Sequence, residues 1–489
     1  MSDLIKKFTS KYRDMPVQVK ASMWFFICSF LQRGIASLST MIFTRLLSPA
    51  DYGRYSAFVT WHDMLGTIII LYLPWGVYEQ GYIKKNTLDE KEHFTSVLMG
   101  LMTALCLFWL GIYFLFRPYF NSFLELTTFQ IICMFIMIWT SSIYCFWSIK
   151  QRIAYKYRRM AVLTLTGAIL QPVSGIFFVI NAKDDKVTAR ILSITIVSVV
   201  LYAGLFFAQM KKKPVLVDID TWKYAFKFNI ALLPHYLSQN VLSSSDKLMI
   251  KKMVGDSEVG IYSLAYSVSM IMTIFNTSLT NTITPWVMTK MKEKKVADIK
   301  TVIYPAIGFI AVVNMLLIIL APEVIRIFAP ADYGAAIYAI PPVVMSVFFM
   351  FLYGIFSVFE MYHEKTKLIS LATLLSALLN LVLNYIFIRA FGYIAAGYTT
   401  LICYIFYALF HYYNMRKICA TEYPDEQILD PKLLLKVAVA FIAFGLLSIF
   451  TYSRLYLRVT LVAGIVLAII IFRKRIVRFI RSISSLRKR

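Results

Sequence analysis

Residues 97–116 read VLMGLMTALCLFWLGIYFLF, twenty consecutive residues without a charged side chain. A helix of about 20 mainly apolar residues is long enough to cross the hydrocarbon core of a bilayer. Because that core offers no hydrogen-bond partner to the backbone, a segment that crosses it satisfies its own amides as an α-helix. This stretch therefore predicts a membrane-spanning helix centred near Leu105.

Comparable stretches recur from one end of the chain to the other. Of the 489 residues, 59% are hydrophobic and only 16% are charged, whereas about 25% are charged in a typical soluble domain. The first stretch, residues 17–43, is too long for the apolar core of a signal peptide and is expected to remain as a span. We predict an all-α polytopic membrane protein with about 14 transmembrane helices, centred near Ser29, Ile68, Leu105, Met137, Leu170, Val199, Leu237, Met270, Val313, Phe348, Ala377, Tyr404, Ala443 and Gly464.

Positive charge is distributed unevenly among the connections between these stretches. The net charge is +25, and 36 of the 51 Lys and Arg residues fall in the two terminal tails and every second loop, against 12 in the remaining loops. Loops rich in Lys and Arg remain in the cytoplasm. The pattern predicts a multi-pass protein of the bacterial inner (plasma) membrane with both termini cytoplasmic, and it accounts for the charge without nucleic acid as a partner.

The two halves of the chain carry related motifs. The segment RLLSPADYGRYS at residues 45–56 matches KMVGDSEVGIYS at residues 252–263, with Gly53 and Gly260 in register. Pro74-Trp75 likewise recurs as Pro285-Trp286. The offset spans an even number of helices, so the repeats share one orientation and are related by an axis along the membrane normal. We expect two pseudo-symmetric six-helix bundles, residues 1–212 and 213–420, followed by two extra helices and a basic cytoplasmic tail in residues 421–489.

Polar side chains form stripes on three of the predicted spans: the first, the seventh, which is its repeat partner, and the eighth. A polar group facing hydrocarbon is costly, so these three spans and the second span, which carries His62, Asp63 and Glu79, are expected to line a hydrated cavity. Packing between helices, or hydrogen bonds from Ser and Thr to their own backbone, is the structural alternative. The candidate substrate-binding residues are Arg33, Ser37, Thr40, His235, Gln239, Asn240, Ser243, Lys247, Tyr266, Thr273, Asn276 and Thr280.

Three carboxylates in or near spans are candidates for coupling transport to an ion: Asp63, Glu79 and Asp246. Asp246 and Lys247 are consecutive, point about 100° apart on a helix, and so are expected to face different partners. A purely structural ion pair is the alternative. The chain has no paired-Cys or HExxH metal motif and no GxxxxGK[ST] loop, so neither a metal nor a cofactor is expected. Asp218 and Asp220 lie in a short loop and are interpreted as structural.

Several motifs in order resemble one known family. They are residues 46–55 (LLSPADYGRY), 245–247 (SDK), 259–266 (VGIYSLAY), 329–334 (APADYG), 380–384 (NLVLN) and 392–397 (GYIAAG). Together they resemble the bacterial O-antigen and capsule oligosaccharide flippases, polysaccharide biosynthesis proteins of the multidrug/oligosaccharidyl-lipid/polysaccharide exporter superfamily. The resemblance implies two bundles arranged as a V and alternating access. Its implied cargo is a polyprenyl-pyrophosphate-linked oligosaccharide, with Arg33 near the diphosphate, and its implied partners are polysaccharide polymerase and chain-length machinery.

Two other functions are weighed against this non-enzymatic flippase. A cation-coupled exporter of drugs or other small molecules from the same superfamily would need acidic residues deep in the cavity. Asp246 permits this, but Arg33 and Lys247 disfavour a cationic cargo. A membrane-embedded polysaccharide polymerase or ligase would usually carry a large outside loop, whereas the longest polar stretch between spans, residues 416–431, is short and lies on the predicted cytoplasmic side.

Overall fold

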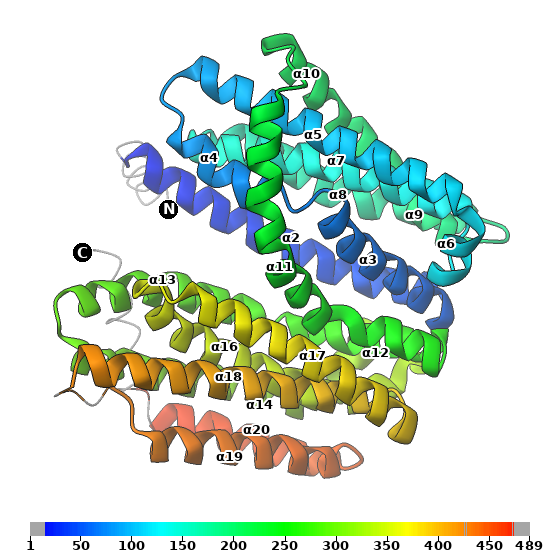
Figure 1. The fold of residues 1–489 in the computed structure, drawn as a ribbon. Helices are drawn as coiled ribbons and strands as arrows, with labels where there is room; N and C mark the ends of the chain where they lie inside the picture. Colours follow the sequence, from blue (N-terminus) through cyan, green and yellow to red (C-terminus); the bar gives the residue numbers. More distant parts are fainter. Residues whose placement is uncertain (1–14, 425, 427, 472, 474–489) are drawn as a thin grey trace, which may run out of the picture. The chain divides into compact units, whose positions relative to one another are not determined.

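A computed structural model of the chain describes residues 15–424, 426, 428–471 and 473. Over this range the protein consists of α-helices and short 3₁₀ or π segments, and no β-strand occurs among the residues described (Figure 1). The predicted all-α class is confirmed. The basic tail expected at the end of the chain lies almost entirely outside the described residues.

Each of the fourteen predicted span centres falls on one helical segment. The single helices are α2 (Val17–Leu46), α5 (Leu88–Leu115), α7 (Thr128–Ile153), α8 (Tyr157–Asn181), α11 (Ile219–Met253), α14 (Lys300–Ile319), α16 (Ile340–Tyr362), α17 (Thr366–Phe391), α18 (Ala395–Glu422), α19 (Pro431–Ser448) and α20 (Leu455–Ile471). The interrupted ones are α3 (Pro49–Ile69) with η1 (Pro74–Tyr78) and α4 (Glu79–Lys84), α9 (Lys186–Ser198) with η2 (Val199–Ala203) and α10 (Gly204–Lys212), and α12 (Asp256–Met270) with α13 (Thr273–Lys292). Short helices α6 (Arg117–Leu124), α15 (Ala321–Phe328), η3 (Val296–Ile299), η4 (Ala331–Tyr338) and η5 (Ile449–Thr451) lie in the connections.

Most of these segments meet strict criteria for crossing a membrane. Ten described helices are long and apolar enough, and α3 with α4, bent by 62°, makes an eleventh. The other three segments are α11 and α18, which carry more polar side chains, and α20, which has only 17 residues. The protein is therefore a multi-pass membrane protein.

By its internal contacts the chain divides into two compact units, residues 1–47 with 57–237, and residues 48–56 with 238–489. In the first, α2 packs on α8, and α7 packs on α5 and α9. In the second, α16 is the central helix: it contacts α12, α13, α14 and α18, and 78% of its most apolar stretch is buried. The units share two helices, since α3 and α11 each contribute residues to both. The boundaries expected at residues 212 and 420 concern the sequence repeat and stay predictions.

The order of helices repeats along the chain, as the motifs predict. Helix α12 begins at residue 256, which is 207 residues after the start of α3 at residue 49. Helices α17 and α18 begin at residues 366 and 395, each 209 residues after the starts of α8 and α9 at residues 157 and 186. Even the short helix α6, which begins at residue 117, has a counterpart in α15, which begins at residue 321. The pseudo-symmetric halves are therefore visible in the positions of the helix breaks.

The two repeat glycines lie where the first turns of α3 and α12 meet, within the second unit. A methyl group added to Gly53 would overlap the carbonyl oxygen of Asp256, and one added to Gly260 would overlap that of Pro49. Pro49 and Asp256 are themselves equivalent in the repeat, so the contact is symmetrical. The close approach of the two backbones explains why both positions carry glycine.

Candidate functional site

Three of the quoted motif segments meet inside the second unit, although they lie far apart in sequence. Ser245 Oγ on α11 donates a hydrogen bond to Asn380 Oδ1 on α17 over 3.1 Å, and Asn384 Nδ2 donates to the same oxygen over 3.0 Å. Asn380 and Asn384 are fully buried. Buried polar groups are hydrogen-bonded in stable proteins, and this shared acceptor oxygen ties α11 to α17.

Asp246 is the carboxylate of this network, with only 1% of its surface exposed. Its oxygens accept hydrogen bonds from Tyr262 Oη over 2.5 Å and from the backbone N–H of Lys247 over 2.9 Å. The Lys247 ammonium lies 4.7 Å from the centroid of the Tyr266 ring, in the range of a cation–π interaction. The consecutive charges thus have different aromatic partners, in agreement with their predicted separation around the helix.

Hydroxyl groups of α18 extend the network. Asn384 Oδ1 accepts a hydrogen bond from Thr399, and Thr400 Oγ1 accepts one from Asn380 Nδ2 over 3.4 Å. Both threonines are 1% exposed. These residues supply one carboxylate, two amides and several hydroxyl groups. Each of these groups contains an oxygen atom with lone pairs. Hard cations prefer oxygen ligands, and the ammonium of Lys247, the next residue in the chain, adds a positive charge near the carboxylate.

A metal cluster has no support in this region. Among the residues that the structure describes, no group of three or more His, Cys, Asp or Glu side chains could hold a metal ion. The described cysteines are unpaired thiols, most of them buried.

A second buried ionisable pair lies in the same unit and was not predicted from the sequence. His411 Nδ1 on α18 is 2.9 Å from Glu360 Oε1 on α16, and both side chains are fully buried. The ring of Tyr407, which hydrogen-bonds Thr373 over 2.9 Å, lies 4.6 Å from the His411 ring between centroids. The sequence does show that Glu360 and His411 are single ionisable residues inside apolar spans. A search for stripes of several polar residues does not detect such isolated positions.

The candidates on α2 lie in the first unit. Arg33 is exposed near the middle of this 30-residue helix. The hydroxyls of Ser37 and Thr40 are half-buried and donate to the backbone carbonyls of Arg33 and Ala36 over 3.0 and 3.1 Å. These backbone bonds agree with the structural alternative for the two hydroxyls, and each oxygen retains lone pairs that accept further bonds.

The candidates on α11 lie on both sides of residue 237, at which this helix passes from the first unit to the second. Gln239 is exposed, while His235, Asn240 and Ser243 are half-buried. Ser243 Oγ donates to the carbonyl of Asn240 over 3.3 Å. Next to His235, the ring of Tyr236 stacks on Tyr72 with centroids 3.8 Å apart, which anchors this part of the helix in the first unit.

The candidates on α13 include one with a clear packing role. Asn276 is buried and donates from Nδ2 to the carbonyl of Val347 on α16 over 2.8 Å. Thr273 Oγ1 donates to the carbonyl of Met270, which stabilises the break between α12 and α13, and Thr280 is half-buried. At Asn276 the helix-packing alternative therefore has direct support.

Of the three carboxylates singled out for ion coupling, only Asp246 is buried. Asp63 is exposed and lies 3.0 Å from His62 Nδ1. Glu79 accepts a hydrogen bond from Arg152 over 3.0 Å, so its charge is compensated within the first unit.

Asp218 caps the start of α11, and Asp220 lies in the first turn of that helix. Asp218 accepts hydrogen bonds from the hydroxyl and backbone N–H of Thr221 over 2.7 and 3.3 Å, at the first turn of α11, and lies 3.2 Å from His93 Nε2. The bonds from Thr221, with that from His93, lower the pKa of Asp218 to about 2. This is the N-cap arrangement, which agrees with the structural interpretation.

Comparison with known proteins places the chain in a family. Residues 42–338 match the family described as polysaccharide biosynthesis protein. Two proteins of Haemophilus influenzae match part of the chain: Lsg locus putative protein 1, 23% identical over 231 residues, and an uncharacterized membrane protein, 20% identical over 235 residues. These matches cover 44% and 47% of the chain and 55% and 58% of the relatives, so the chain spans about half the length of these curated proteins.

The fold occurs in solved structures of transporters. The lipid II flippase MurJ in an inward closed conformation superposes with a TM-score of 0.61 at 15% identity, covering 89% of this chain and 99% of that chain. An inward-facing multidrug resistance MATE family transporter of the MOP superfamily gives 0.62 at 15% identity, covering 81% and 96%. At such identities the likeness shows the fold alone.

Proposed function

The chain belongs to the polysaccharide biosynthesis protein family, and from this premise we propose that it flips a polyprenyl-pyrophosphate-linked oligosaccharide across the bacterial inner membrane by alternating access. The proposal rests on this family membership and on the fold that the chain shares with a lipid II flippase. A lipid diphosphate does not cross hydrocarbon unaided, because removing its charges from water costs many kcal/mol. The product would serve cell-surface polysaccharide assembly.

Arg33 is the proposed ligand of the diphosphate. Arg33 is exposed near the middle of an apolar helix, where a cation is costly in lipid, and this cost supports a role in transport. A planar guanidinium binds two phosphate oxygens at once. Lys247 adds positive charge on α11, and the sugar hydroxyls would meet the remaining polar candidates, among them Ser37, Thr40 and Asn240.

The network around Asp246 is the proposed coupling site. Binding of a proton or a monovalent cation changes the charge of a fully buried group whose donor, Tyr262, lies on another helix. Such binding shifts a conformational equilibrium only as far as the ion prefers one state over the other. Asp63 and Glu79 remain secondary candidates for this role.

The cargo is tested by deleting the gene and measuring lipid-linked oligosaccharide in each leaflet. A flippase predicts accumulation on the cytoplasmic leaflet, restored to normal by the wild-type chain. Arg33→Ala should fail to restore transport, while Arg33→Lys should retain part of it, because charge survives but the bidentate fork does not. Lys20→Ala, at the end of the same helix, is the control. Normal transport by Arg33→Ala would refute the diphosphate assignment.

A small-molecule exporter is the second candidate, favoured by the equally good superposition on the MATE transporter. Purified chain in vesicles separates the two: a drug exporter accumulates cationic dyes against a cation gradient, whereas the proposed flippase does not. A polymerase or ligase predicts a different deletion phenotype, in which unpolymerised or unligated oligosaccharide gathers on the outer leaflet.

The orientation is proposed from the positive-inside pattern. With both termini cytoplasmic, the turn before α3 lies outside. Ser48→Cys, in a background without native cysteines, should react with a membrane-impermeant thiol reagent in intact spheroplasts. Reaction only after permeabilisation would reverse the topology.

A further inference from the structure

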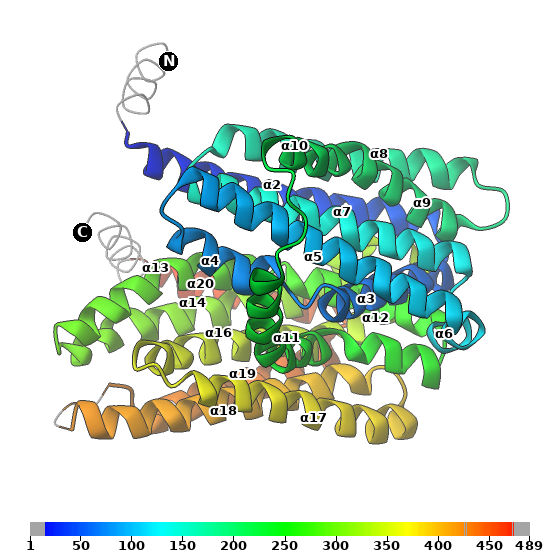
Figure 2. The ribbon, with the colours of Figure 1, turned by 45° about the horizontal axis from the view of Figure 1, so that its top comes forward.

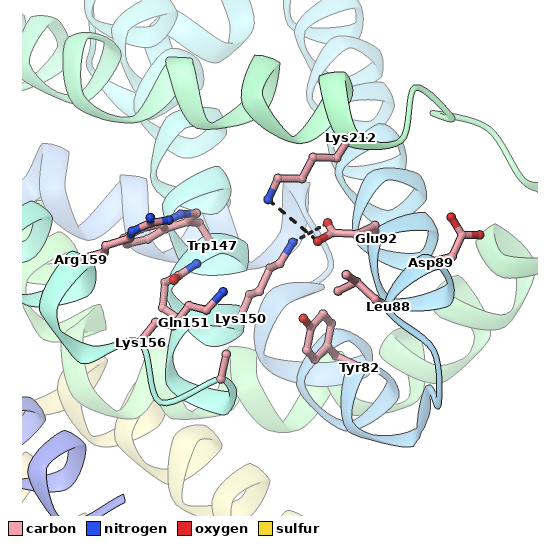
Figure 3. A pocket seen from close by; sticks show the side chains of 11 residues that line it. Tyr82, Leu88, Asp89, Glu92, Trp147, Lys150, Gln151, Lys156, Arg159 and Lys212 are labelled. Atoms are coloured by element: carbon pink, nitrogen blue, oxygen red, sulfur yellow. Dashed lines mark hydrogen bonds and ion pairs between the residues drawn. The ribbon is translucent and has the colours of Figure 1, made fainter. Parts of the chain in front are cut away.

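A pocket of about 750 Å³ opens in the first unit where the ends of α4, α5, α7, α8 and α10 meet (Figure 3). None of the candidate transport residues lines it. Its volume lies within the range of small-ligand sites. The predicted topology places these helix ends at the cytoplasmic surface, where the proposed inner-membrane location exposes them to the headgroups of that leaflet.

The charge of the pocket is positive after its internal pairs are counted. Four cations line it, Lys150, Lys156, Arg159 and Lys212, against two carboxylates, Asp89 and Glu92. Glu92 is already matched, since it bonds Lys150 and accepts from Gln209 Nε2 over 2.8 Å. Asp89 is matched by Lys213, which lies outside the lining and bonds it over 2.7 Å. The remaining positive charge belongs to Lys156, Arg159 and Lys212, of which Lys212 also lies 3.9 Å from Glu92.

The lining of the pocket includes an ion pair that is mostly buried. Lys150 and Glu92 have 12% of their side chains exposed, and their pairing links α5 to α7. Figure 3 shows Lys212 reaching toward Glu92, with Lys156 and Arg159 on the opposite side of the view. Cations at the start of α8 and at the end of α10 therefore line one space together with the paired Lys150 and Glu92.

We propose that this pocket binds the phosphate group of an anionic membrane lipid. Basic pockets between transmembrane helices on the cytoplasmic side suit lipid phosphates, and arginine adds bidentate bonds to phosphate oxygens. Trp147 and Tyr82 supply the aromatic surface that is typical of the interface between headgroups and acyl chains. The assignment goes beyond the transport function and does not depend on the cargo.

The test is a lipid titration of the purified full-length chain in detergent, followed by native mass spectrometry. Phosphatidylglycerol should bind more tightly than phosphatidylcholine. Lys156→Gln with Arg159→Gln removes two unmatched charges, each worth about 1 kcal/mol near a membrane surface, so affinity for phosphatidylglycerol should fall roughly tenfold to thirtyfold. The charge-conserving pair Lys156→Arg with Arg159→Lys should retain it.

The controls separate the lipid from free phosphate and from a folding defect. Lys183→Gln with Lys186→Gln removes the same charge at the opposite helix ends and should leave lipid affinity unchanged. Inorganic phosphate and glycerol phosphate, added as competitors, should displace the lipid only weakly. Equal binding of the two lipids, unchanged affinity in the Lys156/Arg159 glutamine variant, or full displacement by free phosphate would each overturn the proposal. An unaltered elution profile confirms that the variant is folded.

Discussion

Replacing Gly260 by alanine tests the crossing of α3 and α12. The added methyl would overlap the Pro49 carbonyl oxygen and lie 3.1 Å from the Gly53 nitrogen. Both are backbone atoms, so no side-chain rotation relieves the overlap and the two helix starts must separate. Overpacking of this kind costs about 1–3 kcal/mol, against which alanine gains up to about 1 kcal/mol over glycine in a helix. We expect a net loss of about 1–2 kcal/mol.

The assay is thermal unfolding of the purified protein in detergent, followed by tryptophan fluorescence. With about 2–4 °C per kcal/mol for a unit of 150–250 residues, the midpoint should fall by roughly 2–8 °C. Gly308→Ala is the matched control, because nothing lies within 4 Å of a methyl at that position in α14. Gly53→Ala should resemble Gly260→Ala, and the double variant should lose less than the sum of the two because both disrupt the same contact. Equal stability of Gly260→Ala and Gly308→Ala would refute the reasoning.

Three further predictions concern buried or capping charges. Asp246→Asn should remove any dependence of transport on an imposed proton or sodium gradient in vesicles, and a gradient response that persists would exclude Asp246 as the coupling site. His411→Leu should destabilise the chain by about 3 kcal/mol or more because it leaves Glu360 buried without its partner, whereas His411→Leu with Glu360→Leu should be milder; equal losses would show that the pair does not interact. Asp218→Ala should cost about 1 kcal/mol at pH 7 through loss of the cap. Because the pKa of Asp218 is lowered to about 2, this contribution is present above the unfolded pKa of about 3.9 and is lost as the pH falls toward 2; a stability difference that persists unchanged to pH 2 would contradict it.

Long apolar runs and the repeat offset made the fold predictable. The hydrocarbon core dictates the length of a span, so residues 97–116 alone specify most of α5. Gly53 and Gly260 mark equivalent positions in the sequence repeat, and the structure shows that the helix backbones meet at these two residues. The bend between α3 and α4 was not foreseen, because its backbone break at residues 70–73 lies within a continuous apolar stretch.

The contacts of the site could not be predicted, because they join distant segments. Ser245 and Asn380 are 135 residues apart, and nothing local in either helix specifies the other. The pair of Glu360 and His411 was missed for the same reason. The basic pocket could not be predicted for another reason. The positive-inside rule already accounts for its lysines and its arginine, and only the fold shows that they line one space.

The course of helix α11 bears on the proposed coupling role of Asp246. Residues 219–237 of this helix belong to the first unit and residues 238–253 to the second. Pro234 lies near this division and removes a backbone hydrogen bond, which is a common cause of bending in a long helix. On the first side Tyr236 stacks on Tyr72, and on the second side Asp246 is held by Tyr262. In the proposed mechanism, neutralising Asp246 alters the packing of the half of α11 that belongs to the second unit, while the other half is held in the first unit. An ion that binds there shifts the conformational equilibrium only as far as it prefers one state over the other.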